Sequence, residues 1–350
     1  MAFLDAMGAT RAHAECGTLA EAAVEPTQQA ASDSAPMDNV RRGTEHWRQL
    51  MSEQQRAGLD ATLRQTPFDL NGDLVTLRSG FEEAMSYIPV ADDVQRTNLT
   101  FGGVGAIEVS IDGTDSDNVI LYFHGGVYVI GSAAATVPLV ADLARRTSAK
   151  VITVDYRLAP EHPYPAAVDD ARAVYEGLLS QGVDPSNIAF SGESAGGGLA
   201  VALLLAIRDA GLPMPSSAFL MSPYADLTLS GSTIIDKQDV DPLFTEEVLR
   251  RRVGDYVAGA NPSDPFISPV FGDLRGLPPM LIQVGSHEIL LSDAIRLAGR
   301  AAEADVAIAL EVTPGVPHVF QAYAAMLDEG EAALNRAAEF LKTHFSVSQR

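Results

Sequence analysis

Hydrophobic and polar positions follow one another along this chain in blocks that predict strands alternating with helices. Short apolar blocks are typical of strands buried in a domain, and helical patterns such as those at about residues 136–147 and 168–179 lie between them. The apolar blocks span residues 119–123, 151–154, 187–191, 218–221, 280–284 and 308–312. This order predicts an α/β fold with a mostly parallel, doubly wound sheet that is flanked by helices and joined by right-handed crossovers.

Three segments depart from this regular alternation. Residues 97–101 and 106–111 alternate between apolar and polar side chains, which predicts an antiparallel hairpin near an edge of the sheet. Between residues 223 and 278 the connection is too long for a simple loop, and it contains a helical pattern at about residues 245–258. Such a long connection in an α/β domain is usually functional.

The charge balance excludes several classes of partner. The chain has 24 Lys and Arg against 46 Asp and Glu, a formal net charge of −22 at pH 7. Nucleic acids and anionic membranes both require a basic face, so neither is an expected partner, and the acidity favours solubility or salt tolerance. Cys16 is the one cysteine, which excludes an intramolecular disulfide and a cysteine metal cluster. With no apolar run of transmembrane length and no signal-peptide pattern, we expect a cytoplasmic protein without stable membrane insertion.

The segment Gly192-Glu193-Ser194-Ala195-Gly196 has the pattern of a nucleophile elbow. It lies between a short apolar strand and a long helix rich in alanine and leucine, the strand–turn–helix context that a G-x-S-x-G motif requires. Small residues must flank the serine because the turn is tight. The sequence therefore predicts Ser194 as a nucleophile for acyl transfer.

A second motif, His124-Gly125-Gly126, follows a buried strand upstream of this serine. Loops of this kind donate backbone N–H groups to an oxyanion, together with the N–H of the residue after the nucleophile. We therefore predict an oxyanion hole made by Gly125, Gly126 and Ala195. His124 is expected to orient the loop by hydrogen bonding rather than to transfer protons.

The general base must come after Ser194, because the chain order of this fold is serine, acid, histidine. His287, His318 and His344 meet this condition. His344 falls inside the final amphipathic helix, and His287 lies on the same loop as the candidate acid, which is poor geometry for a bridge. His318 follows the last predicted strand, so it is the predicted base.

Two carboxylates compete for the role of the acid. Glu288 lies closest to the end of the strand at 280–284, whereas Asp293 falls in the first turn of the next helix, where a carboxylate also serves as a helix-start residue. We favour Glu288 and keep Asp293 as the alternative; either could orient and stabilise the histidine. The scattered histidines form no H-x-x-x-H pair, so no metal site and no cofactor are predicted.

These motifs resemble those of the esterases of the α/β-hydrolase superfamily that are similar to hormone-sensitive lipase. The resemblance covers about residues 84–341. It rests on His124-Gly125-Gly126, on Asp155-Tyr156-Arg157-Leu158-Ala159-Pro160-Glu161 with Pro163 and Pro165-Ala166-Ala167, on Gly192-Glu193-Ser194-Ala195-Gly196-Gly197, on Ser222-Pro223-Tyr224-Ala225-Asp226-Leu227, and on Pro317-His318-Val319-Phe320. It implies the α/β-hydrolase fold with a helical cap, short-chain acyl esters as substrates, and frequently a dimer formed at the edge of the last strand.

The chain departs from this family at three positions. Val127 stands where the family's oxyanion loop usually carries a third glycine, Glu193 where an aspartate often precedes the nucleophile, and Glu288 where the acid is usually aspartate. We assign Val127 and Glu193, together with Tyr128, to the substrate pocket.

The helices that precede the first strand carry no strands of their own, so we assign them to the cap. The predicted divisions are a mobile N-terminal tail (1–36), the N-terminal part of the cap (37–90), the catalytic α/β domain (91–222 and 276–350) and an insertion that contributes to the cap (223–275).

The sequence therefore predicts a serine carboxylesterase that works through an acyl-enzyme. The same triad could act on amides, lactones or carbamates, because selectivity depends on the cap and the acyl pocket. A ligand receptor without catalysis on the same fold is a third reading, which the presence of His318 disfavours.

Overall fold

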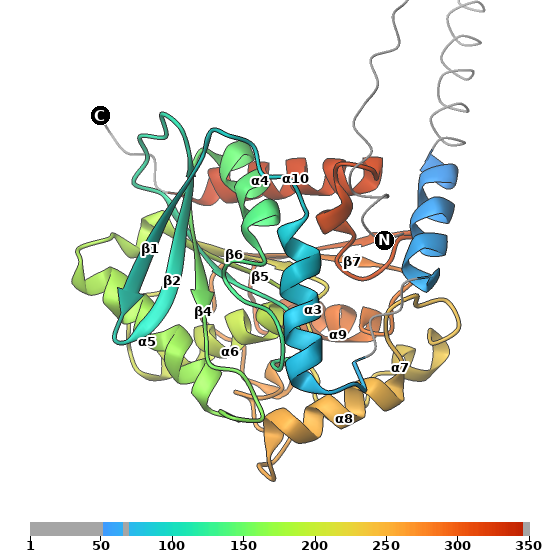
Figure 1. Ribbon diagram of the computed structural model, residues 1–350. Helices are drawn as coiled ribbons and strands as arrows, with labels where there is room; N and C mark the ends of the chain where they lie inside the picture. Colours follow the sequence, from blue (N-terminus) through green and yellow to red (C-terminus); the bar gives the residue numbers. More distant parts are fainter. Residues whose placement is uncertain (1–51, 66–69, 346–350) are drawn as a thin grey trace, which may run out of the picture.

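The computed structural model describes residues 52–65 and 70–345, which form an eight-stranded sheet with helices on both faces (Figure 1). The strand order is β1-β2-β4-β3-β5-β6-β7-β8. The strands are β1 (Val94–Phe101), β2 (Val104–Ile111), β3 (Val119–Phe123), β4 (Lys150–Asp155), β5 (Ile188–Glu193), β6 (Ser217–Met221), β7 (Met280–Gly285) and β8 (Ile308–Thr313). β2 pairs antiparallel with β1 and β4, and every other pairing is parallel. The predicted sheet and its opening hairpin are confirmed.

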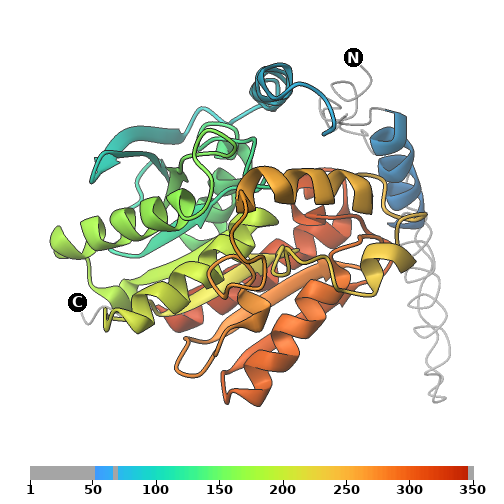
Figure 2. The ribbon, with the colours of Figure 1, turned by 90° about the horizontal axis from the view of Figure 1, so that it is seen from below.

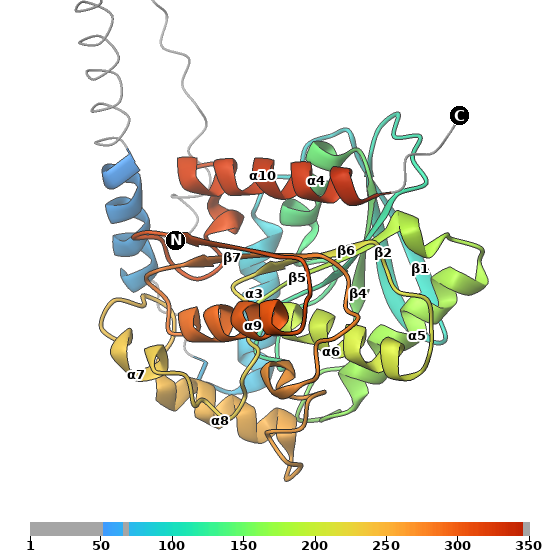
Figure 3. The same ribbon diagram turned by 180° about the vertical axis from the view of Figure 1, so that it is seen from behind.

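Two layers of helices cover this sheet. The helices are α3 (Leu74–Ser86), α4 (Val137–Thr147), α5 (Ala166–Ser180), α6 (Ala195–Asp209), α7 (Thr233–Asp236), α8 (Glu246–Val257), α9 (Leu291–Glu303) and α10 (Asp328–His344), with short 3-10 turns η1 (Pro185–Asn187), η2 (Pro269–Phe271) and η3 (Phe320–Tyr323). One face packs against α4 and α10, and the opposite face packs against α5, α6 and α9 (Figures 1 and 3). In β3, for example, Ile120 and Tyr122 lie in the hydrophobic core on the side of α4 and α10. Leu121 and Phe123 lie in the core on the side of α5, α6 and α9. This burial on both faces explains the continuous apolar runs.

The N-terminal helices lie beside the insertion that separates β6 from β7. Residues 52–65 are helical and α7 and α8 lie on the same side of the molecule (Figures 1 and 2). The guanidinium of Arg252, buried in α8, donates to the carbonyls of Leu70 (2.7 Å) and Gly72 (2.9 Å) just before α3. Segments far apart in the sequence are thus joined by hydrogen bonds.

The predicted N-terminal helices have different bounds in the structure. The pattern at 39–55 lies largely outside the described residues, of which residues 52–65 are helical. The helix expected at 80–85 begins earlier, at Leu74, because the Asp73 side chain accepts the N–H of Thr76 and caps it. The tail assigned to residues 1–36 also lies outside the described residues.

The carboxyl ends of the central strands carry the predicted chemistry. His124 follows β3, Ser194 follows β5, Glu288 lies three residues beyond β7 and His318 lies beyond β8. Parallel strands end at one edge of the sheet, so the topology brings these four residues to the same region. Among residues 52–65 and 70–345, no helix combines the length and the apolar character needed to cross a membrane.

Candidate active site

Ser194 lies in the tight turn between β5 and α6, in a backbone conformation that is rare for a side-chain-bearing residue. Its φ is 53° and its ψ is −120°, and it is 4% exposed. The turn requires the flanking glycines: a Cβ on Gly192 would lie 2.4 Å from the carbonyl oxygen of Gly196, and one on Gly196 would lie 1.9 Å from that of Phe123. The G-x-S-x-G pattern is therefore a steric requirement of this turn.

His318 and Glu288 form a buried hydrogen-bonded pair. The Nδ1 of His318 lies 2.6 Å from Glu288 Oε2. The other carboxylate oxygen, Oε1, accepts the hydroxyl of Ser222 (2.8 Å) and the backbone N–H of Gly285 (2.7 Å). The His318 Nε2 atom is buried and makes no hydrogen bond with the described part of the chain. The pair thus leaves one imidazole nitrogen available for a reacting group.

Ser222 contacts this pair, although the sequence motifs that contain it did not reveal the contact. Its hydroxyl donates to Glu288 and accepts the backbone N–H of Val319 (3.1 Å), the residue after the histidine. One hydroxyl therefore holds both the acid and the loop that carries His318. The signal available in the sequence is its position directly after β6, one strand away from the elbow.

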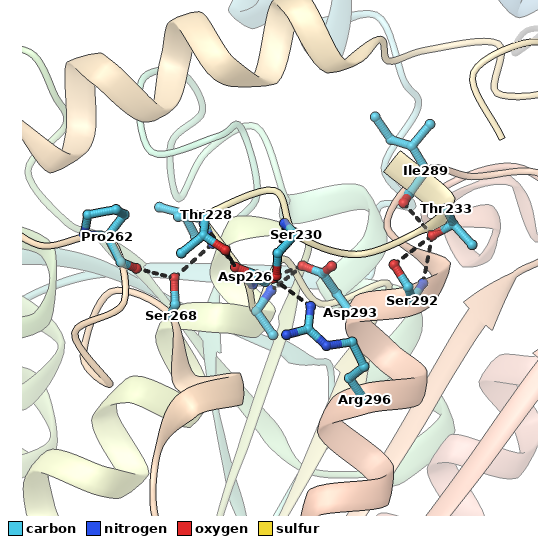
Figure 4. Close-up of polar contacts among 12 residues, drawn as sticks. Asp226, Thr228, Ser230, Thr233, Pro262, Ser268, Ile289, Ser292, Asp293 and Arg296 are labelled. Carbon is cyan, nitrogen blue, oxygen red and sulfur yellow. Dashed lines mark hydrogen bonds and ion pairs between the residues drawn. The ribbon is translucent and has the colours of Figure 1, made fainter. Parts of the chain in front are cut away.

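Asp293 lies elsewhere and has a different role from the one predicted. It does not cap α9, which begins after Leu290 without a side-chain cap. Its Oδ2 accepts the backbone N–H groups of Ala225 (3.0 Å) and Asp226 (2.9 Å), in the loop after β6 (Figure 4). Asp293 does lie in the first turn of α9, as expected, but its expected role as a helix cap is wrong, because its carboxylate binds N–H groups of a loop 67 and 68 residues away.

Asp226 and Asp293 are neighbouring carboxyl groups with opposite shifts. Burial raises the pKa of Asp293 well above its usual value, and its Oδ1 has no hydrogen-bond partner in the described structure. Burial also opposes ionisation of Asp226, but hydrogen bonds from Ser230, Thr228 and Arg296 outweigh it and lower the pKa. The geometry favours an ionised Asp226 paired with Arg296 beside a protonated Asp293 (Figure 4).

The loop after β3 passes directly beside Ser194. A Cβ on Gly125 would lie 3.1 Å from the Cβ of Ser194 and 3.2 Å from the carbonyl oxygen of Glu193, which is tighter than most Cβ contacts and favours glycine there. The backbone N–H of Gly125, however, already donates to Glu193 Oε1 at 2.7 Å. The prediction of Gly125 as an oxyanion donor is corrected by this contact, because the Glu193 side chain turns back beneath the loop. Gly126 follows with a φ of 108°.

Glu193 binds the loop after β3, the predicted oxyanion loop, instead of lining the pocket. Besides Gly125, its carboxylate accepts the hydroxyl of Tyr122, from β3. Burial raises the pKa of Glu193 to about 7, against the opposing effect of these two hydrogen bonds. Its assignment to the substrate pocket is therefore corrected: both carboxylate oxygens are bound by the protein.

His124 holds the same loop from below. Its Nδ1 lies 2.7 Å from the carbonyl oxygen of Gly125, and its ring stacks on Tyr156 with the centroids 4.1 Å apart. The Tyr156 hydroxyl in turn donates to the carbonyl oxygen of His124. Burial lowers the pKa of His124 to about 4, so the ring is neutral at physiological pH. These contacts match the orienting role expected from the sequence.

Two aromatic side chains of the insertion contact the site. The ring of Phe244 meets that of His318 edge-on, with centroids 5.0 Å apart and an angle of 84°. Tyr128, in the oxyanion loop, stacks on Tyr256 of α8 at 3.8 Å. Val127 and Tyr128 are both buried and both have positive φ, of 48° and 64°. The oxyanion loop and His318 are therefore both packed against the insertion.

No candidate metal centre accompanies these side chains. Among the residues that the structure describes, no cluster of three or more His, Cys, Asp or Glu side chains could hold an ion. The groups at the site are those of acid–base and nucleophilic chemistry.

The comparisons with known proteins agree with this geometry. A profile of the α/β-hydrolase fold matches residues 120–322, more than half of the chain. The chain belongs to the α/β-hydrolase family. Among solved structures, an esterase from the bacterial hormone-sensitive lipase family superposes with a TM-score of 0.80 at 39% identity, covering 83% of this chain and 98% of that one. The resemblance inferred from the motifs is confirmed.

Curated relatives of this α/β hydrolase are ester-cleaving enzymes. An esterase of Acinetobacter venetianus is 41% identical over 283 residues, which are 81% of this chain and 93% of the relative. An acetyl-hydrolase of Streptomyces hygroscopicus is 44% identical over 224 residues, 64% of this chain and 75% of the relative. This α/β hydrolase is accordingly a carboxylic ester hydrolase.

Proposed function

We propose that this esterase cleaves short-chain acyl esters through an acyl-enzyme formed on Ser194. Glu288 and His318 serve as the acid and the base of the triad. The observation that carries the proposal is the buried His318–Glu288 pair, 2.6 Å apart, whose second imidazole nitrogen has no other partner in the described chain. A histidine oriented through Nδ1 is prepared to accept a proton at Nε2.

In the first half-reaction the Ser194 hydroxyl attacks the ester carbonyl while His318 takes its proton. Glu288 holds the required tautomer and stabilises the imidazolium. The protonated histidine then donates to the departing alcohol, leaving an acyl group on the serine. Water, activated by His318 in the same way, releases the acid in the second half-reaction. Glu288 is suited to this role because Ser222 and Gly285 leave its Oε2 for the histidine alone.

The negative oxygen of each tetrahedral intermediate requires donors beside Ser194. We assign this task to the backbone N–H groups of Ala195, at the first turn of α6, and of Gly126. Removing one such donor typically costs about 3 kcal/mol of transition-state stabilisation. Gly125 contributes indirectly, by anchoring the loop to Glu193.

We further assign residues 37–90 and 223–275 to a cap over the site. The contacts of Phe244 with His318 and of Tyr256 with Tyr128 support a cap that shapes the acyl pocket. Val127, buried in the oxyanion loop, replaces a smaller residue and favours short acyl chains.

We further propose that two copies of the chain form a dimer at the edge of the last strand. β8 is an edge strand of the sheet, and its Leu310 and Val312 side chains are 36% and 42% exposed. Apolar side chains on an unpaired edge favour association with a second copy. Sedimentation velocity of the wild-type protein and of Leu310→Lys would show a dimer and its loss.

The activity itself is tested with Ser194→Ala and p-nitrophenyl butyrate, the ester with which crystals of the similar esterase EstE5 were soaked. EstE5 superposes with a TM-score of 0.80 at 39% identity. We expect the variant to lose hydrolysis and fluorophosphonate labelling together. Ser191→Ala is the matched control, because Ser191 is buried in β5, the strand that precedes Ser194, and its hydroxyl has no partner among the described residues. Retained hydrolysis in Ser194→Ala would refute the proposal.

A further inference from the structure

Two side chains of the insertion hold the backbone of the residue that follows Glu288. The Oδ2 of Asp241 accepts the N–H of Ile289 at 2.8 Å. The hydroxyl of Thr233 donates to the carbonyl oxygen of the same residue at 2.7 Å (Figure 4). Both peptide groups of Ile289 are thereby fixed by the insertion, which lies between β6 and β7 in the sequence.

Asp241 also shapes the part of the insertion that covers the histidine. Its second oxygen, Oδ1, accepts the backbone N–H groups of Leu243 (2.8 Å) and Phe244 (3.0 Å). Phe244 is the residue whose ring packs edge-on against His318. The carboxylate of Asp241, which is 5% exposed, therefore connects the loop that carries Glu288 with the aromatic ring that packs against His318.

Asp241 is a buried carboxyl group whose hydrogen bonds reach two segments of the site. Burial disfavours its charge and raises its pKa, while the three backbone donors and the nearby His318 oppose that shift. A buried carboxylate is costly unless its oxygens are fully satisfied. Here two of the three donors belong to residues beside the proposed triad: Ile289 follows Glu288, and Phe244 contacts His318.

We propose that Asp241 is a positioning residue for the hydrolysis, which couples the insertion to Glu288 and His318. This inference rests on the proposed triad. Asp241 keeps Glu288 in reach of the histidine through Ile289 and limits the rotation of the imidazole through Phe244. Its carboxylate is buried and bound by backbone N–H groups, so we expect its effect to fall on the chemical step and not on binding.

The test replaces Asp241 with asparagine. Asparagine has one acceptor oxygen and one NH2 group. The NH2 group would face either the N–H of Ile289 or the N–H groups of Leu243 and Phe244, and this places two donors against each other. We expect kcat per fluorophosphonate-titrated Ser194 to fall about tenfold, with KM changed less than about twofold. Asp239→Asn, an exposed carboxylate of the same insertion, is the matched control and should retain the wild-type kcat.

A double-mutant cycle separates positioning from general stability. Phe244→Leu removes the ring from His318 and should lower kcat by about threefold. Because Asp241 acts partly through Phe244, the double variant should lose less than the product of the two single losses. Fully multiplicative losses would overturn the link between these two residues.

A second variant applies if Asp241→Asn does not fold. Thr233→Val keeps the shape of the side chain and removes the other contact to Ile289, and kcat should again fall by about threefold. An unchanged kcat in the folded variant tested would overturn the inference. Ser194→Ala in the same assay separates the two failures: if that variant remains active, the proposed triad fails, and if it is inactive while Asp241→Asn matches Asp239→Asn, the role of Asp241 alone fails.

Discussion

Glu193 binds the backbone N–H of Gly125, so the residue before Ser194 holds the loop that faces this serine. The contact closes a short chain of interactions from β3 through Tyr122 and Glu193 to the oxyanion loop. The spacing between loop and serine therefore depends on a carboxyl group whose pKa burial raises to about 7.

This raised pKa predicts a pH-dependent stability. Below pH 4.5, the ordinary value for this group, Glu193 is protonated in both the folded and the unfolded chain. Between pH 4.5 and about 7 the folded state keeps the proton that the unfolded state releases, so stabilisation by Glu193 declines as pH rises through 7. Chemical denaturation should show wild-type protein losing about 2 kcal/mol relative to Glu193→Gln between pH 5 and pH 8. Parallel curves for the two proteins would contradict the buried, protonated state.

The two candidate acids are distinguished by catalysis. Glu288→Ala should lower kcat by about 10³–10⁴-fold, because His318 loses its orienting carboxylate. Asp293→Asn should leave kcat within about twofold of wild type, since an amide oxygen still accepts the N–H groups of Ala225 and Asp226. Initial rates with p-nitrophenyl butyrate decide between them, and a larger loss for Asp293→Asn would reverse the assignment.

Asp293 should matter for stability instead. In Asp293→Leu the buried N–H groups of Ala225 and Asp226 lose their acceptor, which should cost about 2–4 kcal/mol of unfolding free energy. Urea denaturation of this variant beside Asp293→Asn measures the difference. Equal stability of the two variants would show that the loop after β6 does not depend on this acceptor.

Ser222 should contribute to turnover by holding the acid. Ser222→Ala removes a hydrogen bond from Glu288 and leaves the N–H of Val319 without its acceptor, so kcat should fall about tenfold. Ser217→Ala is the control, because Ser217 is also buried, at the start of β6, and its hydroxyl has no partner in the described structure. The measurement is kcat at saturating ester. Equal kcat values for the two variants would contradict a contribution of Ser222 to turnover.

Arg252 should anchor the segment before α3 to the insertion. Arg252→Met leaves the carbonyl groups of Leu70 and Gly72 without their donor, and we expect a loss of about 2–3 kcal/mol and faster protease cleavage at residues 70–73. Arg251→Met, at an exposed neighbouring position, should behave as wild type. Limited proteolysis with mass spectrometry locates the cut, and unchanged cleavage would contradict the anchor.

Local patterns sufficed for the sheet and for the elbow, because burial on two faces and a glycine-flanked turn both leave a short-range signature. The pairing of Glu288 with His318 also followed from strand order. The roles of Glu193 and Asp293 could not be predicted in this way. Each depends on where a side chain meets a backbone N–H from a distant segment, Gly125 for Glu193 and Ala225 for Asp293. Neither partner is marked by the residue type or by its spacing.

The peptide groups of Ser194 are bound by residues at the end of β6 and just after it, which has a consequence for folding. The N–H of Ser194 donates to the carbonyl of Met221 at the end of β6, and its carbonyl accepts the N–H of Tyr224 just beyond that strand, both at 2.9 Å. A chain folding from its N-terminus can complete β5 and α6 and still lack the contacts that hold the serine in its rare conformation. We therefore expect Ser194 to acquire this backbone conformation only when β6 docks, and esterase activity to appear during refolding no earlier than that step.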